Sequence, residues 1–284
     1  MSTIKTYISN LTNKLCEIYP KEEAGSIAKF YVCEVIKISN TELICCQHEN
    51  LDENKLQKLK NSENRLIEGE PVQYVTGQAY FYGLKFFVDK NVLIPRQETE
   101  ILVQNVIQTY KQRTGLRILD IGTGSGCIAI CLKKNMPQHT VFAIDISEKA
   151  IHVCKRNAEI NKVDVVVVKS DIFADKVFPD AESFDIIVSN PPYVLESEKA
   201  MMHKNVTGYE PASALYVSDN NPLIYYKAIL DFAKQYLNIG GEVIVEINEK
   251  YPEEIIELNK QKGFSENEIM YDLNKKPRFI KSKK

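Results

Sequence analysis

Strand-like and helical runs alternate through the second half of this 284-residue chain, and that alternation restricts the fold more than any other feature. Helical stretches separate most of the apolar runs, an arrangement that predicts an α/β fold with a parallel sheet covered on both faces. The carboxyl ends of such strands share one edge of the sheet, where open α/β folds bind ligands. The expected strands span 116–121, 140–145, 164–168, 184–189 and 241–247, and the expected helices about 126–135, 147–161, 222–237 and 252–262.

The first 75 residues have a different pattern, with apolar side chains at helical spacing and no strand-like alternation. They predict a small helical bundle with helices over 2–19, 21–39, 41–47 and 52–68. Aromatic residues then surround Gly83 in what reads as a strand pair, and Thr99 or a neighbour is placed to cap the following helix. We therefore expect a helical domain over 1–75, a β-hairpin linker over 76–95, a third domain over 96–284, and a long loop over 194–221.

Composition excludes several classes of protein. No apolar run approaches the roughly 18–20 residues that span a bilayer, and the N-terminus has no signal-peptide core, so we expect a cytoplasmic protein without a membrane partner. The net charge of −2 argues against stable nucleic-acid binding. The exception is the basic tail, Lys275–Arg278 and Lys281–Lys284, which we interpret as a solvated, partly frayed terminus. Seven cysteines without paired metal spacing indicate reduced thiols and no metal site.

A glycine-rich loop closes the first strand of the alternating region and opens a helix. Its spacing is Gly-x-Gly-x-Gly, whereas a dinucleotide loop would need a third glycine at 127, which is cysteine here. Glycines let the backbone approach a ligand closely, and a preceding acid, Asp120, could help to hold an ammonium group or water. The alternative is an ordinary strand–helix turn. The candidate ligand-binding residues of this loop are Gly122, Thr123, Gly124, Ser125 and Gly126.

Two further acids follow the next two strands. Asp145 is placed to accept both hydroxyl protons of a ribose. Asp171 and Ile172 could receive the amine and the ring of an adenine. A ligand with an adenine, a ribose and an amino-acid end is S-adenosyl-L-methionine, whose product after methyl transfer is S-adenosyl-L-homocysteine.

The tetrapeptide Asn190-Pro191-Pro192-Tyr193 ends the fourth strand. The Asn190 side-chain oxygen and the Pro191 carbonyl can each accept a hydrogen bond from a planar amine, and the prolines stiffen the turn. Tyr193 offers a flat face. The alternative is a simple strand-ending turn. Beside the glycine loop, the set predicts that Asn190, Pro191 and Tyr193 are catalytic, that all four residues bind substrate, and that Asn190 also lies at the cofactor.

With these motifs the chain resembles the HemK/PrmC family of protein-glutamine N5-methyltransferases. The resemblance implies a Rossmann-like, seven-stranded methyltransferase domain, a linking hairpin and a helical domain that helps to recognise the substrate. The implied substrate is the glutamine of the Gly-Gly-Gln motif in class 1 peptide chain release factors. The tracts that carry the resemblance are 71–77, 81–83, 94–100 and 209–215, with Gly240-Gly241, Glu246, Asp272-Leu273 and Arg278.

Some positions depart from the family pattern, and some roles stay open. Gln97 stands where the family usually has proline, and Asn248 where it commonly has glycine, so we expect altered loop detail rather than lost chemistry. Pocket roles for Phe81, Arg96, Glu98, Thr99 and Glu210 compete with core, capping or surface roles. An adenine N6-methyltransferase acting on nucleic acid, which shares the Asn190–Tyr193 motif, and a non-catalytic binding module remain as rival functions.

Overall fold

The chain forms two compact units in a computed structural model that describes residues 2–174, 177–178 and 183–284. The first unit comprises Met1–Gln78 together with the short segment His203–Tyr209. The second comprises Ala79–Met202 and Glu210–Lys284. The chain therefore leaves the second unit once, contributes seven residues to the first, and returns.

The first unit is the predicted helical bundle. Its helices are α1 (Ile4–Leu15), α2 (Lys21–Ile36), α3 (Asn40–Cys46), α4 (Glu53–Ile67) and the short α5 (Val72–Thr76), to which α9 (Lys204–Tyr209) is added from the distant segment. Leu11, Leu15 and Leu59 are almost completely buried in its core, because the apolar stripes of the helices face one another. The expectation that these stripes form a core is confirmed.

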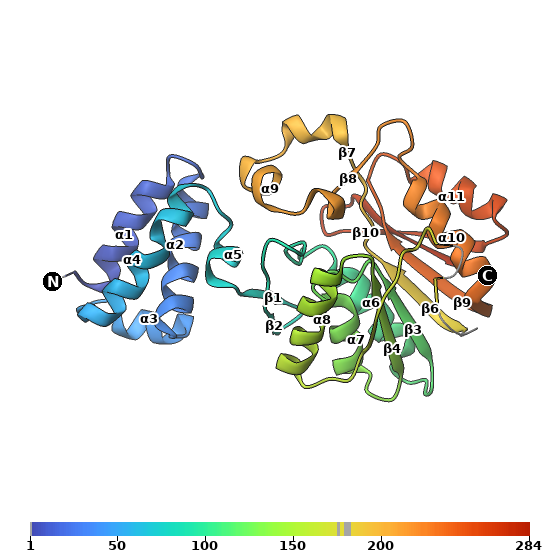
Figure 1. The fold of residues 1–284 in the computed structure, drawn as a ribbon, viewed down its shortest axis with the longest axis horizontal. Coiled ribbons are helices and arrows are strands. Elements are labelled where there is room, and N and C mark those ends of the chain that lie inside the picture. Colours follow the sequence, from blue (N-terminus) through green and yellow to red (C-terminus); the bar gives the residue numbers. More distant parts are fainter. Residues whose placement is uncertain (1, 175–176, 179–182) are drawn as a thin grey trace. The chain divides into compact units, whose positions relative to one another are not determined.

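A seven-stranded sheet forms the centre of the second unit, with the order β10-β11-β9-β6-β3-β4-β5 (Figure 1). The five strands from β9 to β5 are parallel, as the alternation predicts, whereas β11 pairs antiparallel with both β9 and β10. The strands are β3 (Arg117–Ile121), β4 (Thr140–Asp145), β5 (Val166–Lys169), β6 (Phe184–Ser189), β9 (Leu237–Glu246), β10 (Ser265–Tyr271) and β11 (Pro277–Lys283).

Helices cover both faces of this sheet, and each face has its own apolar core. Helices α6 (Glu100–Tyr110), α7 (Cys127–Asn135) and α8 (Glu148–Asn161) contribute to one core, and α10 (Ile224–Tyr236) and α11 (Pro252–Gln261) to the other. Five short elements interrupt the predicted loop between β6 and α10. Besides α9 they are the 3-10 turns Glu196–Met201 and Ala212–Ala214 and the paired strands β7 (Val194–Leu195) and β8 (Tyr216–Val217).

The predicted hairpin is present as β1 (Ala79–Phe81) and β2 (Leu84–Phe86), joined by a two-residue turn. Tyr82 and Gly83 both have positive φ, 48° and 74°, which matches the twist of a tight hairpin. The hairpin belongs to the second unit, because Phe81 and Phe86 are buried in its core. Phe81 is thus a core residue rather than a pocket wall.

The prediction of a frayed basic tail is wrong. Residues 277–283 form β11, which lies between two other strands, and Phe279 and Ile280 are buried. The basic side chains are paired with acids: Lys276 with Glu249, Arg278 with Asp272, Lys281 with Glu268, and Lys283 with Glu266. Phe279 and Ile280 face opposite sides of the sheet and enter the two different apolar cores, which the surrounding charges of the tail obscured in the sequence.

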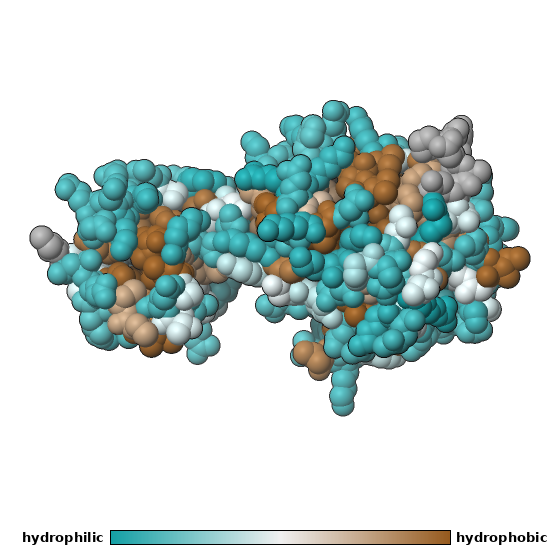
Figure 2. All heavy atoms as spheres, turned by 90° about the horizontal axis from the view of Figure 1, so that it is seen from below, coloured by the Kyte–Doolittle hydropathy of each residue, from teal (hydrophilic) through white to brown (hydrophobic). Residues whose placement is uncertain are grey.

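The surface of each unit is mostly hydrophilic, with separate hydrophobic areas on the face that Figure 2 shows. Single exposed apolar side chains such as Ile44, Ile239 and Leu273 are common on soluble domains. Among the described residues, no helix combines the length and apolarity that a membrane span would need.

Candidate active site

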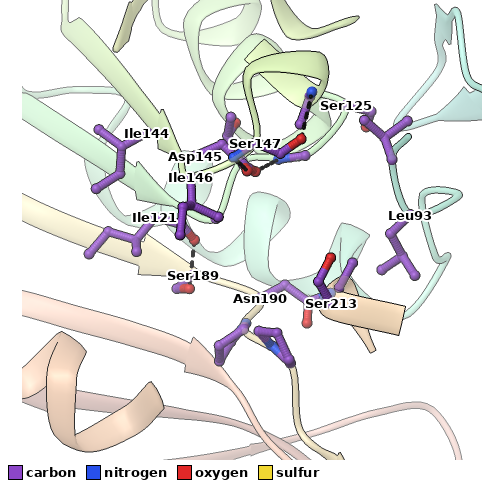
Figure 3. A pocket seen from close by; sticks show the side chains of 18 of the residues that line it. Leu93, Ile121, Ser125, Ile144, Asp145, Ile146, Ser147, Ser189, Asn190 and Ser213 are labelled. Carbon is purple, nitrogen blue, oxygen red and sulfur yellow. Dashed lines mark hydrogen bonds between the residues drawn. The ribbon is translucent and has the colours of Figure 1, made fainter. Parts of the chain in front are cut away.

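A cavity of about 410 Å³ opens at the carboxyl ends of β3, β4, β5 and β6. Its lining comes from the ends of these strands and the segments that follow them, from two further segments, 90–96 and 211–214, and from Thr99, Tyr225 and Ile229. Figure 3 shows Asp145, Ser189 and Asn190 around it, with Leu93 and Ser213 on the side away from the strands. The volume is within the range of small-molecule sites, about 300–1,000 Å³. The position is the one that the sheet topology predicts.

The glycine loop forms one wall of the cavity. Gly122, Thr123, Gly124 and Ser125 line it, and the Gly124 backbone N–H donates to the Asp145 carboxylate at 2.9 Å. Gly126 is not among the lining residues. It begins α7 with a φ of 82°, and a Cβ there would lie 2.6 Å from the Cys154 Sγ. Its role is therefore close helix packing rather than ligand contact.

Asp145 places a half-buried carboxylate in the cavity wall at the end of β4. One carboxylate oxygen accepts the Gly124 N–H and the other the Ser147 N–H at 2.8 Å, which leaves further acceptor capacity on both oxygens. Burial raises the pKa of Asp145 above its usual range, and the backbone N–H donors oppose that shift. Asp171 and Ile172 line the same cavity from the loop after β5, so the structure brings the three residues together.

Asp120 lies beneath the glycine loop and does not reach the cavity. Its Oδ2 accepts from the Thr123 hydroxyl at 2.6 Å and from the Ala129 N–H at 3.3 Å. Its Oδ1 has no hydrogen-bond partner among the described residues. Complete burial raises the pKa of this carboxyl to about 7. Asp120 is therefore an anchor of the loop, and a direct contact with a ligand ammonium, which the sequence suggested, does not fit its position.

Three of the four residues of the tetrapeptide line the cavity: Asn190, Pro191 and Pro192. Tyr193 is not among the lining residues, and its hydroxyl donates to the Glu246 Oε1 at 2.9 Å. Burial, followed by the proximity of Glu246, raises the pKa of Tyr193 well above its usual value, so the phenol stays a neutral donor. Glu246 thus holds the Tyr193 hydroxyl, and the ring does not line the cavity, where the sequence suggested a flat face for a planar group.

Thr99 and Glu246 stand behind Asn190. Thr99 occupies the N-cap position of α6, but its side chain makes no capping hydrogen bond. Its hydroxyl donates to the Glu246 Oε2 at 2.6 Å and accepts from the Asn190 Nδ2 at 3.2 Å. The sequence included Glu246 in a motif without assigning it a role. A carboxylate at the end of the apolar run 241–247 was the signal that could have singled it out.

The wall away from the glycine loop depends on Glu210, which is buried. Its carboxylate accepts from the Ile94 N–H at 3.1 Å and from the Arg96 guanidinium at 2.6 Å. This contact joins the two segments that add Leu93, Pro95, Arg96, Pro211, Ser213 and Ala214 to the lining. Sequence reasoning missed most of these residues, although both tracts carry the family resemblance. Gln97 and Glu98 are exposed, which explains why the usual proline at 97 can be replaced.

Asn248 also supports the tetrapeptide. Its Nδ2 donates to the Tyr193 carbonyl at 3.1 Å and to Glu198 at 3.3 Å, and its Oδ1 accepts the Lys250 N–H at 3.0 Å. A glycine, which the family commonly has here, could make none of these side-chain bonds. The departure therefore adds a connection between the end of β9 and the turn after β6.

The histidines lie apart from this chemistry. None of His48, His139, His152 and His203 lines the cavity, and His139 is buried with a pKa lowered by burial. A search of the described residues finds no group of three His, Cys, Asp or Glu side chains that could hold a metal ion.

Comparisons with known proteins agree with this architecture. Residues 96–209 match the Methyltransferase small domain, and residues 8–77 match the PrmC N-terminal domain. A methyltransferase structure from Pyrococcus furiosus shares the fold, with a TM-score of 0.53 and 21% identity over 79% of this chain and 98% of that one. The Thermus thermophilus 16S rRNA methyltransferase RsmC has a TM-score of 0.51 at 17% identity, over 73% of this chain and 49% of that one.

Closer relatives match almost the whole chain. The release factor glutamine methyltransferase of Flavobacterium psychrophilum is 38% identical over 281 residues, which cover 98% of both chains. The protein of the same name from Bacteroides thetaiotaomicron is 37% identical over 99% of both. With a nucleotide-sized cavity at the strand ends and relatives of this extent, the chain belongs to the release factor glutamine methyltransferase family.

Proposed function

We propose that this chain transfers a methyl group from S-adenosyl-L-methionine to the side-chain amide nitrogen, N5, of a glutamine. The glutamine is that of the Gly-Gly-Gln motif in class 1 peptide chain release factors, and the other product is S-adenosyl-L-homocysteine. The observation that carries the proposal is the position of Asn190 and Pro191 in the same cavity as Asp145 and Asp171. Cytoplasmic translation would then be the setting of the reaction.

The residues of the cavity fit the proposed methyl donor. Asp145 retains acceptor capacity for the ribose hydroxyls, and Asp171 and Ile172 lie next along the same edge for the adenine. The glycine loop offers a close backbone approach for the amino-acid end. When bound, the donor supplies an electrophilic methyl group on a sulfonium.

The chain's own residues then have to orient a poor nucleophile. The lone pair of an amide nitrogen is delocalised into its carbonyl. Hydrogen bonds from the amide NH2 to the Asn190 side-chain oxygen and the Pro191 carbonyl would align it and favour the more positive nitrogen of the transition state. We assign no general base, because an amide protonated on nitrogen is strongly acidic and loses its proton readily.

The helical unit is assigned to recognition of the release factor in this proposal. Support comes from the match of residues 8–77 to the PrmC N-terminal domain and from relatives that align over both units. We retain 1–75 as the recognition domain, 76–95 as the linking hairpin and 96–284 as the methyltransferase domain, although the compact units divide after Gln78.

The direct test is methylation of a purified class 1 release factor with labelled donor, followed by peptide mapping. We expect a single methyl group on the glutamine of the Gly-Gly-Gln motif. Asn190→Ala should lower kcat by roughly 10²–10³-fold, because a fixed dipole at the reacting nitrogen is lost. Asp145→Ala should instead weaken donor binding in calorimetry. Near-normal methylation by Asn190→Ala would contradict the orienting role.

The same assay separates the rival functions. An adenine N6-methyltransferase would label DNA or RNA in place of the release factor, and a flipped or single-stranded base would be required. A non-catalytic module would label neither substrate. Failure to bind S-adenosyl-L-methionine would favour that module.

A further inference from the structure

A continuous path of hydrogen bonds connects Asn190 to a buried carboxylate. The Asn190 Nδ2 donates to the Thr99 Oγ1 at 3.2 Å, and the Thr99 hydroxyl donates to the Glu246 Oε2 at 2.6 Å. The Tyr193 hydroxyl donates to the other oxygen, Oε1, at 2.9 Å. Thr99 is 2% exposed and Glu246 is 1% exposed. The path therefore joins half-buried Asn190, which lines the cavity in the turn after β6, to two buried residues at the start of α6 and the end of β9.

With Glu246 ionised, the protons of this path can be arranged in one direction only. An ionised carboxylate accepts hydrogen bonds and donates none, and the two hydroxyl donors on Glu246 match that form. A threonine hydroxyl has a single proton, and Glu246 takes it. Toward Asn190, the Thr99 oxygen can therefore act only as a hydrogen-bond acceptor. The amide NH2 of Asn190 fits that partner, whereas its oxygen would meet another acceptor.

We propose that Thr99 and Glu246 are positioning residues that fix the amide orientation of Asn190. With its NH2 held by Thr99, Asn190 presents Oδ1 to the cavity as an acceptor. This inference rests on the proposed function, in which the substrate NH2 donates to Asn190. A reversed Asn190 amide would place its own N–H donors against those of the substrate.

The burial of these groups supports a role beyond stability. A buried carboxylate is costly unless it is paired, and a well-packed apolar residue of similar size often stabilises a protein as well or better. Thr99 makes no capping bond at the start of α6, where its backbone is already helical, and its hydroxyl donates to Glu246 instead. A buried carboxylate is thus kept at the end of β9, where an apolar residue would serve stability at least as well.

The experiment measures kcat, the KM for release factor, the donor affinity and the melting temperature of the full-length enzyme. Thr99→Val keeps the volume but removes the hydroxyl, and we expect kcat to fall roughly 10- to 100-fold. Thr99→Ser, the matched control, keeps the hydroxyl and should recover most of the activity. Donor affinity should stay within about twofold in both, since the Thr99 hydroxyl is bonded to Glu246 and Asn190 and to neither of the donor-binding acids.

A double-mutant cycle separates positioning from a purely structural effect. If Thr99 acts through Asn190, Thr99→Val should cause little further loss of kcat in an Asn190→Ala background. Additive losses would overturn the proposal, as would equal losses in Thr99→Val and Thr99→Ser. If Thr99→Val does not fold, Thr99→Ala answers the same question, since it removes only the hydroxyl and one methyl group.

Glu246→Gln tests the carboxylate itself. Its amide can donate to Thr99 and so release the hydroxyl proton toward Asn190, and kcat should fall while the protein still folds. Unchanged kcat in this variant would overturn the part assigned to Glu246. If the wild-type enzyme does not methylate release factor, the proposed function has failed. If the wild type is active and the Thr99 variants match it, the positioning inference alone has failed.

Discussion

The buried carboxylates of Glu246 and Asp120 differ in their hydrogen-bond partners. Glu246 has a hydroxyl donor on each oxygen, whereas Asp120 has both of its donors on one oxygen and none on the other among the described residues. Burial raises the pKa of both groups. The difference in partners means that ionisation of Asp120 is poorly compensated, and its protonation should therefore be visible in the stability of the protein.

Asp120 predicts a specific pH dependence of the free energy of unfolding. Its pKa is 3.8 when unperturbed and about 7 in the folded protein, so the folded state binds more protons between these values. The resulting stabilisation is fully present below about pH 4 and is lost as the pH rises through about 7. Asp120→Asn can keep the Thr123 and Ala129 bonds without a charge. We expect its stability relative to wild type to increase by roughly 1–3 kcal/mol between pH 5 and pH 8.

Urea denaturation at the two pH values, without added donor, measures this difference. Asp164→Asn, which removes an exposed carboxylate, serves as the control for the general effect of charge. A constant difference between Asp120→Asn and wild type at both pH values would contradict the assignment of the buried carboxyl as the cause.

The sequence predicted several roles at this scale but not the connections between them. Asn190, Pro191 and Asp145 follow strands, and the shared edge of a parallel sheet is enough to bring them together. The partnership of Thr99 with Glu246 joins residues 147 positions apart. No local sequence pattern specifies that contact, and the sequence therefore predicted Thr99 to be a helix cap.

Among the elements, the C-terminal strand shows where sequence periodicity was misjudged. The parallel strands are long apolar runs, which are conspicuous in sequence because both of their faces are buried. In β11, Lys281 and Lys283 lie on either side of buried Ser282, and the charge of these lysines suggested a frayed tail. Lys281 and Lys283 instead each form an ion pair with an acid on the neighbouring strand β10. The family resemblance implied seven strands, but local reasoning alone predicted five and missed both β10 and β11.

Phe279 tests this assignment, because it is completely buried on β11. Truncation of a buried aromatic side chain leaves a cavity, and Phe279→Ala should lower the free energy of unfolding by about 3–5 kcal/mol. Lys283→Ala on the same strand removes a partly exposed ion pair and should cost about 1 kcal/mol or less. Denaturant unfolding compares the two. Similar small losses in both variants would mean that the tail is not an integral strand.

At the scale of the whole molecule, the connection between β6 and α10 belongs to both compact units. It begins at the tetrapeptide Asn190–Tyr193, contributes His203–Tyr209 to the helical unit, and returns at Glu210, which holds Arg96 in the cavity wall. Within the helical unit, His203 stacks on Tyr19 with ring centroids 5.4 Å apart, and the Tyr209 hydroxyl donates to the Glu68 carbonyl at 3.1 Å. One stretch of chain thus contributes both to the helical unit and to the lining of the cavity in the second unit.

We expect the structure of residues 203–209 to be stabilised by Tyr19. Helix α9 has six residues, too few for a stable helix on its own, so tertiary contacts must hold it. Tyr19→Ala removes the stacking partner of His203, and we expect faster hydrogen exchange of the amides in 203–209. Tyr19→Phe keeps the ring and loses only the long 3.5 Å contact with Asn205, so its exchange should stay near that of wild type. Amides of β3 and β6 should be unaffected in both variants, and unchanged protection of 203–209 in Tyr19→Ala would show that the helix is held by other contacts.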